Sequence, residues 1–220
     1  MKYISLNHNS APTSFKKAVI NGLAPDKGLY FPEKDVKLPK SFIESLKTLD
    51  NNEICYEVIS NYIDDEIPKN KLLEIVNDTI SFKIPLKKIE QSVYSLELFH
   101  GPTLAFKDIG AKFMASCLNY FKDSYTSKKI TVLVATSGDT GGAVAKGFSN
   151  TKDIDVCILY PKGKISEVQK KQITTNGSYV TAIEVEGDFD LCQSMVKKAF
   201  NDQEINRKVA LTSANSINVA

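Results

Sequence analysis

From residue 92 onward, apolar segments with the composition of β-strands alternate with segments whose apolar residues recur at helical spacing. Ile130–Ala135 is rich in β-branched residues and is typical of a strand covered on both faces. A helix at Gly142–Phe148 and a strand at Val156–Tyr160 follow after short links. This alternation predicts a parallel sheet flanked by helices, in which ligands bind beyond the carboxyl ends of the strands.

The same region is predicted to hold further strands at Val93–Leu98, Tyr179–Val185 and Val209–Leu211, and helices at Asp108–Phe121, from Ser166 onward, and at Phe189–Phe200. Chemistry is therefore expected in the loops that follow the strands, after Leu98, Ala135, Tyr160 and Leu211.

The region before residue 92 has a different pattern, made mostly of short amphipathic helices. Phe15, Ala18 and Val19, for example, would share one helical face after a Thr-Ser start signal. We therefore predict two domains, a mainly helical one at residues 1–91 and the first part of an α/β domain at residues 92–220.

Composition is that of an ordinary globular protein, with 42% apolar and 25% charged residues. A net charge of +2 gives no electrostatic footprint for nucleic acid or an anionic membrane, and no apolar run has membrane-spanning length. The four cysteines lack zinc or redox spacing, and the N-terminal residues lack a signal-peptide core. These features predict a cytoplasmic protein with buried free thiols and no metal ion.

A glycine-rich loop, Thr136–Ala143, joins the Ile130–Ala135 strand to the next helix. Its three glycines allow close backbone approach to a ligand, and free N–H groups at a helix N-terminus favour an anion. The loop lacks the Gly-Lys-Ser or Gly-Lys-Thr of a P-loop. Its Asp-Thr-Gly tripeptide resembles that of aspartic proteases, but those are all-β proteins that need a second aspartate. We interpret the loop as a ligand site.

Lys107 lies in the segment Phe99–Asp108, which joins a predicted strand to an amphipathic helix. A cation at a helix N-terminus is opposed by the helix dipole, and the apolar neighbours Ala105 and Phe106 favour partial burial. Both effects favour the neutral amine, which is the nucleophile in imine chemistry. An exposed lysine next to apolar residues by chance is the alternative.

The sequence resembles the threonine synthase family of fold-type II enzymes that depend on pyridoxal phosphate (PLP). The resemblance covers the whole chain and is most specific around Lys107, in the lysine segment of that family. The segments that carry it, in the family's order, are Met1–Ser5 with Ala11–Pro12, Gly22–Pro32, Leu96–Asp108, Ser137–Gly141, Tyr160–Gly163 with Ser166 and Gln169, and Thr212–Asn218.

The resemblance implies a lyase that converts O-phospho-L-homoserine and water to L-threonine and phosphate, the last step of threonine biosynthesis. It implies that Lys107 binds PLP as a Schiff base and then moves protons between substrate carbons. The implied cofactor contacts are Lys107, Ser137, Gly138, Asp139 and Thr140. The implied substrate contacts are Ser137, Thr140, Asn215 and Asn218. His100 is not assigned a proton-transfer role.

Members of this family are about twice as long as this chain, so the sequence corresponds to their N-terminal half. The family's PLP-phosphate cup would then lie beyond Ala220. For the isolated 220-residue chain we therefore expect an incomplete sheet, exposed apolar edges and weak or absent activity.

Two alternatives remain at this point: another fold-type II lyase, such as a serine or threonine dehydratase, and a PLP-free binding relative. Assays that compare phosphohomoserine with serine and threonine as substrates would distinguish the first alternative from a threonine synthase. Retention of both Lys107 and the Ser137–Gly141 loop argues against the second. The sequence leaves the oligomeric state open.

Overall fold

A computed structural model describes residues 1–124 and 127–214 of the chain. The chain divides into two units, with unit 1 formed by Met1–Ile80 and unit 2 beginning at Ser81. The domain boundary predicted between residues 91 and 92 instead falls in the turn of a β-hairpin that belongs to unit 2.

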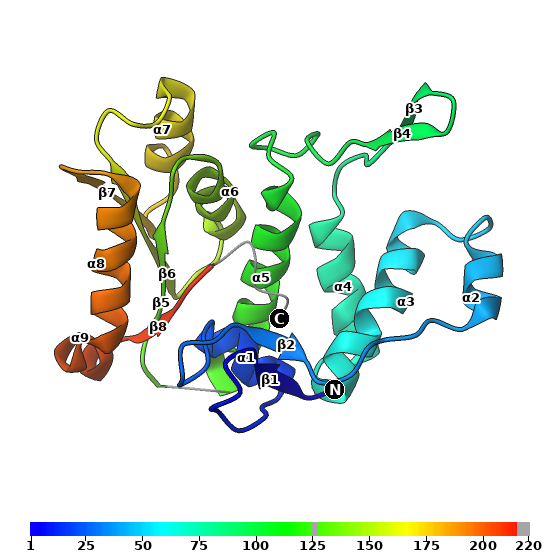
Figure 1. Ribbon diagram of the computed structural model, residues 1–220, viewed down its shortest axis with the longest axis horizontal. Helices are drawn as coiled ribbons and strands as arrows, with labels where there is room; N and C mark the ends of the chain where they lie inside the picture. The colour runs from blue at the N-terminus through cyan, green and yellow to red at the C-terminus, as the bar shows by residue number, and fades with distance from the viewer. Residues whose placement is uncertain (125–126, 215–220) are drawn as a thin grey trace. The chain divides into compact units, whose positions relative to one another are not determined.

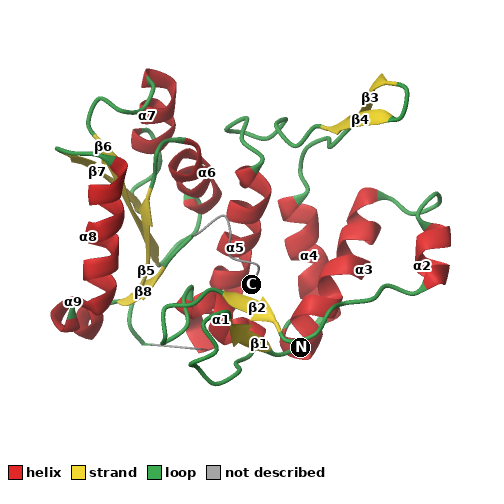
Figure 2. Cartoon of the chain, viewed as in Figure 1, coloured by secondary structure: helices red, strands yellow, loops and turns green. Residues whose placement is uncertain are grey.

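Unit 1 is mainly helical, with one small antiparallel pair of strands, β1 and β2 (Figures 1 and 2). Its core is built on fully buried aromatic and aliphatic side chains, among them Tyr3, Phe15 and Leu72. Its elements are β1 Tyr3–Ser5, α1 Phe15–Asn21, β2 Tyr30–Pro32, α2 Lys40–Ser45, α3 Asn51–Ile63, the 3-10 turn η1 Asp64–Glu66 and α4 Lys69–Thr79.

Local side-chain bonds explain where the unit 1 helices begin. Asp50 and Glu53 form a reciprocal capping box at the start of α3, which satisfies two backbone N–H groups that the helix itself leaves open. The Glu66 carboxylate accepts hydrogen bonds from the backbone N–H groups of Phe15 and Lys16, at 2.8 and 3.0 Å, and so anchors the start of α1.

Unit 2 contains the predicted parallel sheet, which confirms the α/β fold class. Its strands lie in the order β7-β6-β5-β8. The elements of unit 2 are β3 Leu86–Glu90, β4 Val93–Leu96, α5 Lys107–Phe121, the 3-10 turn η2 Lys122–Ser124, β5 Ile130–Ala135, α6 Asp139–Phe148, β6 Ile154–Pro161, α7 Glu167–Thr174, β7 Val180–Val185, α8 Phe189–Asn201, α9 Gln203–Lys208 and β8 Ala210–Thr212.

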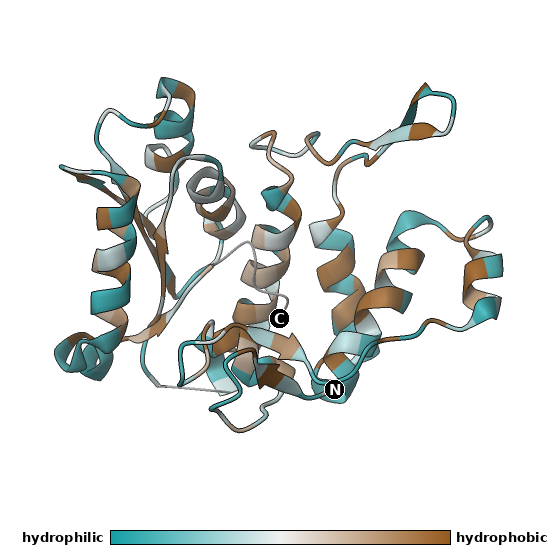
Figure 3. Cartoon of the chain, in the orientation of Figure 1, coloured by the Kyte–Doolittle hydropathy of each residue, from teal (hydrophilic) through white to brown (hydrophobic). Residues whose placement is uncertain are grey.

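The sheet has helices on both faces, as the apolar runs of β5 and β6 require. Leu133 and Leu159 pack with Cys192 and Val196 of α8 on one face, while α6 and α5 lie on the other (Figure 1). Figure 3 shows the strongly hydrophobic colouring along these central strands. The three residues of β8 pair with the first half of β5, up to Val132.

One predicted strand has a different role from the one expected. Val93–Leu96 forms β4, but it pairs antiparallel with β3 in a two-stranded hairpin rather than joining the parallel sheet. The turn residues are Gln91 and Ser92, and Ser92 has φ 66°. Because this turn lacks the Asn-Gly or Asp-Gly signature of tight hairpins, nothing in the sequence pattern indicated β3.

The hairpin exposes most of its apolar side chains to solvent. Leu86, Ile89, Val93, Tyr94 and Leu96 are each at least 45% exposed. This exposed apolar surface lies on a separate two-stranded sheet and not on an edge of the parallel sheet.

Candidate active site

Lys107 is the first residue of α5, at the end of a loop that folds back on the helix it precedes. Asp108, only 4% exposed, holds this loop closed. Its carboxylate accepts hydrogen bonds from the Thr103 backbone N–H at 2.9 Å and from the Thr103 hydroxyl at 2.5 Å. A Cβ at Gly101 would lie 2.5 Å from the same carboxylate, so only glycine fits there. Asp108 thus fixes the backbone from which Lys107 projects.

The Lys107 side chain is half-buried, and its Nζ lies 5.0 Å from the centre of the Phe106 ring. A ring face at this distance attracts a cation and partly shields the amine from water. Leu104, in the same loop, has φ 62°, a left-handed conformation that is strained for a residue with a branched side chain. Strain of this kind is common at functional sites, and here it lies three residues from the predicted nucleophile.

The glycine-rich loop between β5 and α6 is organised by Thr136, which is buried at the end of β5. Its hydroxyl oxygen accepts hydrogen bonds from the backbone N–H groups of Gly138 at 3.0 Å and Gly141 at 2.9 Å. Gly138 has φ 138°, which residues with a side chain rarely adopt. Thr136 was not singled out from the sequence, because its hydroxyl serves the backbone and not a ligand.

Helix α6 begins at Asp139, so the predicted site residues Ser137 to Thr140 surround a helix N-terminus. Ser137 and Asp139 are exposed and Thr140 is half-buried. First-turn N–H groups, hydroxyls and the positive end of the helix dipole suit a bound anion such as a carboxylate.

Helix α7 ties both loops to one scaffold through two glutamines that lie one turn apart. Gln172 Nε2 donates to the Thr103 carbonyl oxygen in the lysine loop, at 3.1 Å. Gln169 Nε2 donates to Asp139 Oδ1 at the start of α6, at 2.9 Å. From the sequence, Gln169 was named only among the segments that carry the family resemblance, and Gln172 was given no role. Their i, i+3 spacing on one helix face is a sequence signal that could have indicated a shared function.

The helices that carry the two loops, α5 and α6, pack directly against each other. A Cβ at Gly147 of α6 would lie 3.0 Å from the backbone of Ala111 in α5, so glycine permits this close approach. Lys107 and the Ser137–Thr140 segment therefore lie at the starts of two helices that pack together, and α7 forms a hydrogen bond to each of the two loops.

A charged cluster lies just before the lysine loop. His100 Nε2 lies 2.7 Å from Glu97 Oε2, and Lys87 Nζ lies 3.4 Å from the same oxygen. The hydrogen bond from His100, helped by the charge of Lys87 and opposed by partial desolvation, holds the pKa of Glu97 below its usual value. The contact with Glu97 gives His100 a structural partner next to the lysine loop.

Two predicted substrate residues, Asn215 and Asn218, lie outside the described residues. Within residues 1–124 and 127–214, no group of three or more His, Cys, Asp or Glu side chains is arranged to hold a metal ion. In that same part of the chain, no helix is long and apolar enough to cross a membrane. All four cysteines are free thiols; Cys117 and Cys192 are buried, whereas Cys55 and Cys157 are only partly so, which corrects the expectation that all would be buried.

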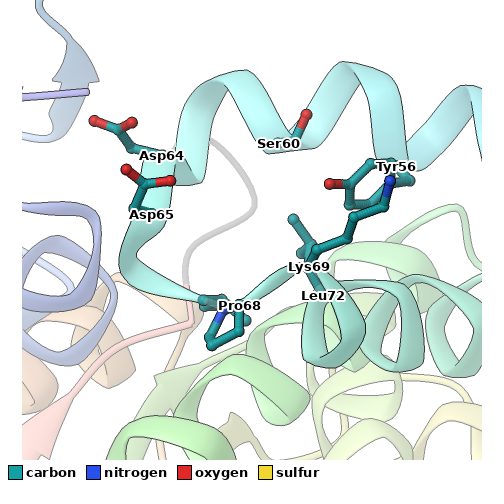
Figure 4. Close-up of a pocket in the computed structure, with 8 residues that line it drawn as sticks. Tyr56, Ser60, Asp64, Asp65, Pro68, Lys69 and Leu72 are labelled. Carbon is teal, nitrogen blue, oxygen red and sulfur yellow. The ribbon is translucent and has the colours of Figure 1, made fainter.

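Unit 1 has a separate cavity of about 230 Å³ between α3 and α4 (Figure 4). Lys69 lies over the Tyr56 ring at 5.3 Å, and Asp64 pairs with the N-terminal ammonium. The cavity contains none of the residues predicted for cofactor chemistry. Its lining is Tyr56, Ser60, Asp64, Asp65, Ile67, Pro68, Lys69 and Leu72.

The residues present fit a cofactor that carries an aldehyde and that acts on a substrate with an anionic group. Lys107 supplies a partly shielded primary amine on a rigid loop, as imine formation requires. The start of α6 supplies N–H groups and the hydroxyls of Ser137 and Thr140. These donors are the chemistry expected of a PLP site.

Comparisons with known proteins agree with this geometry. Residues 2–80 match the family profile described as threonine synthase N terminus, and residues 78–220 match the profile described as pyridoxal-phosphate dependent enzyme. Threonine synthases of Haemophilus influenzae and Escherichia coli are 44% and 42% identical over 220 residues. The chain spans about half the length of these relatives, 51% of each, and all of its own residues are covered.

Solved structures give the same result. The crystal structure of threonine synthase from Escherichia coli matches with a TM-score of 0.90 at 42% identity, covering 100% of this chain and 50% of that one. The structure of PLP-bound threonine synthase from Brucella melitensis matches with a TM-score of 0.90 at 36% identity, covering 100% and 48%. These matches confirm the predicted resemblance to threonine synthases, the fold-type II architecture and the PLP cofactor. The chain belongs to the family of pyridoxal-phosphate-dependent enzymes.

Proposed function

We propose that the protein carrying this chain, in its full natural length, is a threonine synthase. It converts O-phospho-L-homoserine and water to L-threonine and phosphate in the last step of threonine biosynthesis. The observation that carries the proposal is the placement of Lys107 at the start of α5, on a loop closed by a buried carboxylate. Similarity to threonine synthases over the whole chain supports it.

Lys107 is the proposed catalytic residue. Bound PLP supplies an electron sink for the substrate carbons. The Lys107 amine holds the cofactor until substrate arrives, and its freed Nζ then carries protons at the α- and β-carbons of the substrate. Asp108 and Thr103 keep this amine at a constant position during that work.

The start of α6 is the proposed site for the substrate carboxylate and the cofactor ring. Ser137 and Thr140 provide hydroxyl groups beside the N-terminus of the helix. Asp139 would orient the cofactor or the substrate amine through its exposed carboxylate. Asn215 and Asn218 remain proposed substrate contacts on the basis of the resemblance.

We propose the cytoplasm as the location, because four free thiols suit a reducing compartment. The isolated residues 1–220 are expected to show weak or absent activity. The exposed apolar side chains of the β3–β4 hairpin and the greater length of the relatives both support this expectation.

The test is an assay of the full-length protein with PLP and O-phospho-L-homoserine, in which phosphate and threonine are both measured. We expect equal amounts of the two products and little turnover of serine or threonine. Lys107→Arg keeps the charge but cannot form the imine, so it should lower kcat by at least about a thousandfold. Lys146→Arg, at an exposed lysine of α6, is the matched control.

Phosphate release that survives Lys107→Arg would contradict the assigned role of this lysine. Rapid turnover of serine or threonine, with none of phosphohomoserine, would favour the dehydratase alternative and overturn the proposed function.

A further inference from the structure

The Gln169 side-chain amide forms two hydrogen bonds, one through its oxygen and one through its nitrogen. Its Oε1 accepts from the Ser166 backbone N–H at 2.9 Å, while the Ser166 hydroxyl accepts from the Gln169 backbone N–H at 3.2 Å. This reciprocal pair is the capping box of α7. Its Nε2 points the other way and donates to Asp139 Oδ1 at 2.9 Å.

The two hydrogen bonds have different chemical requirements. A capping box needs only an acceptor at Gln169, and a glutamate would serve as well. The bond to Asp139 needs a donor, which a glutamate carboxylate does not have. Capping alone therefore does not explain why the residue is glutamine.

Gln169 also packs on the backbone of the loop that leads to Asp139. A Cβ built on Gly138 would lie 2.3 Å from Gln169 Nε2 and 2.4 Å from its Cδ. The amide thus contacts the loop at the point where the backbone has φ 138°. One side chain thereby restrains both the loop backbone and the carboxylate that follows it.

Asp139 is bound from α7 by the neutral amide of Gln169, while nearby lysines pair with other carboxylates. Lys170 is paired with Glu184 of β7 at 2.7 Å, and Lys162 is paired with Glu186. The charged side chains on α6, on α7, on β7 and in the loop before α7 are Asp139, Lys146, Glu167, Lys170, Lys171, Glu184, Lys162 and Lys164.

We propose that Gln169 is a positioning residue that aims the Asp139 carboxylate into the active site. The proposal rests on the proposed function, which places Asp139 beside the cofactor and substrate. Gln169 would act through Asp139 and would not itself touch the substrate. Because α7 also binds the lysine loop through Gln172, the same helix would keep both loops in register.

Gln169→Glu is the sharpest variant, because it keeps the capping acceptor and replaces the donor with a second carboxylate. At neutral pH the two carboxylates repel, so that one must take up a proton or Asp139 must swing away. Gln203→Glu is the matched control, since it adds the same charge at the exposed first residue of α9. The double variant Asp139→Asn with Gln169→Glu restores an amide–carboxylate pair with the roles exchanged.

The first measurement is thermal unfolding of the full-length protein without cofactor between about pH 3.5 and about pH 7, a range that spans the ordinary carboxyl pKa values of about 3.9 and about 4.3. Gln169→Glu should melt below the wild type by a gap that widens as the pH rises, because repulsion grows as both carboxylates ionise. The gap should not widen for Gln203→Glu or for the double variant. A constant gap for Gln169→Glu would show that the capping box is its only role and would overturn the proposal.

The second measurement is the kinetics of the same proteins with PLP and phosphohomoserine. Gln169→Glu should lower kcat/KM by about tenfold to a hundredfold at neutral pH, with partial recovery at lower pH. A value within about twofold of Gln203→Glu would overturn the proposal. If the wild type makes no threonine, the proposed function fails, while the unfolding measurement still decides whether Gln169 holds Asp139.

Discussion

The lysine loop before α5 and the glycine-rich loop before α6 are each closed by a side chain, but by side chains of opposite kinds. In the lysine loop, the buried Asp108 carboxylate reaches back from the helix to Thr103. In the glycine-rich loop, the neutral Thr136 hydroxyl reaches forward from the strand to Gly138 and Gly141. The first loop depends on one buried charge, and the second depends on glycine conformations. Removing a holding group should therefore cost more in the first loop than in the second.

Asp108→Ala should destabilise the protein more than removal of the Thr136 hydroxyl. It leaves the Thr103 N–H and hydroxyl without their acceptor in a part-buried site, which should lower the free energy of unfolding by about 2 kcal/mol. Chemical denaturation monitored by circular dichroism would measure this change. Thr103→Ser, which keeps both donors, is the control; an equal loss in the control would indicate lost packing and not lost hydrogen bonds.

Gly138→Ala tests the dependence of the second loop on glycine. The new alanine would have to keep φ 138°, and its Cβ would meet the Gln169 side chain. Together these effects should lower the free energy of unfolding by about 2 kcal/mol. Gly163→Ala is the control, because Gly163 has φ 66° but nothing lies within 4 Å of the position that its Cβ would take. Its loss should be about 1 kcal/mol, from backbone strain alone. Equal losses would show that the contact with Gln169 carries no weight.

Thr136→Val removes the hydroxyl acceptor of the glycine-rich loop with little change in shape. The N–H groups of Gly138 and Gly141 would each lose a partner, which should cost about 1.5 kcal/mol. Thr136→Ser keeps the acceptor and should retain most of the stability. The comparison between the loops fails if Thr136→Val is as damaging as Asp108→Ala in the same denaturation experiment.

The smallest expected effect is the pH dependence contributed by Glu97, at the edge of the lysine loop. Its pKa is held below the usual 4.5, chiefly by the hydrogen bond from His100. A depressed folded-state pKa gives stability that is present above the unfolded value and is lost as the pH falls through the folded value. In a plot of the free energy of unfolding against pH, Glu97→Gln should therefore reduce the loss of stability below pH 4.5. An unchanged acid limb would contradict this assignment.

The two loops also differ in how far the sequence predicts them. Glycines and hydroxyls gathered after the apolar run Ile130–Ala135 indicated a ligand loop, because those residue types act through the backbone nearby. The sequence did not predict that Thr103 would bind Asp108, because the two side chains come into contact only once the loop has folded back. Gln172 was missed for the same reason, because its contact with Thr103 joins residues 69 positions apart.

The fold shows a similar division. The apolar run of β5 predicted a buried parallel strand, because burial on both faces leaves a local composition signal. Strand β3 left no such signal, since it is exposed and the turn after it is not glycine-based, and the strand pattern of β4 did not reveal its antiparallel partner. Helix α9 was missed because the short stretch Gln203–Lys208 has too few turns to show periodicity.

The most direct test of the account is the intact mass of the full-length protein, before and after borohydride reduction in the presence of PLP. Reduction fixes the imine, and peptide mapping then locates it. The account predicts an increment of one PLP on the peptide that contains Lys107, and none in Lys107→Arg. An increment on a different lysine, or no increment on the full-length wild type, would contradict the central claim that Lys107 binds the cofactor.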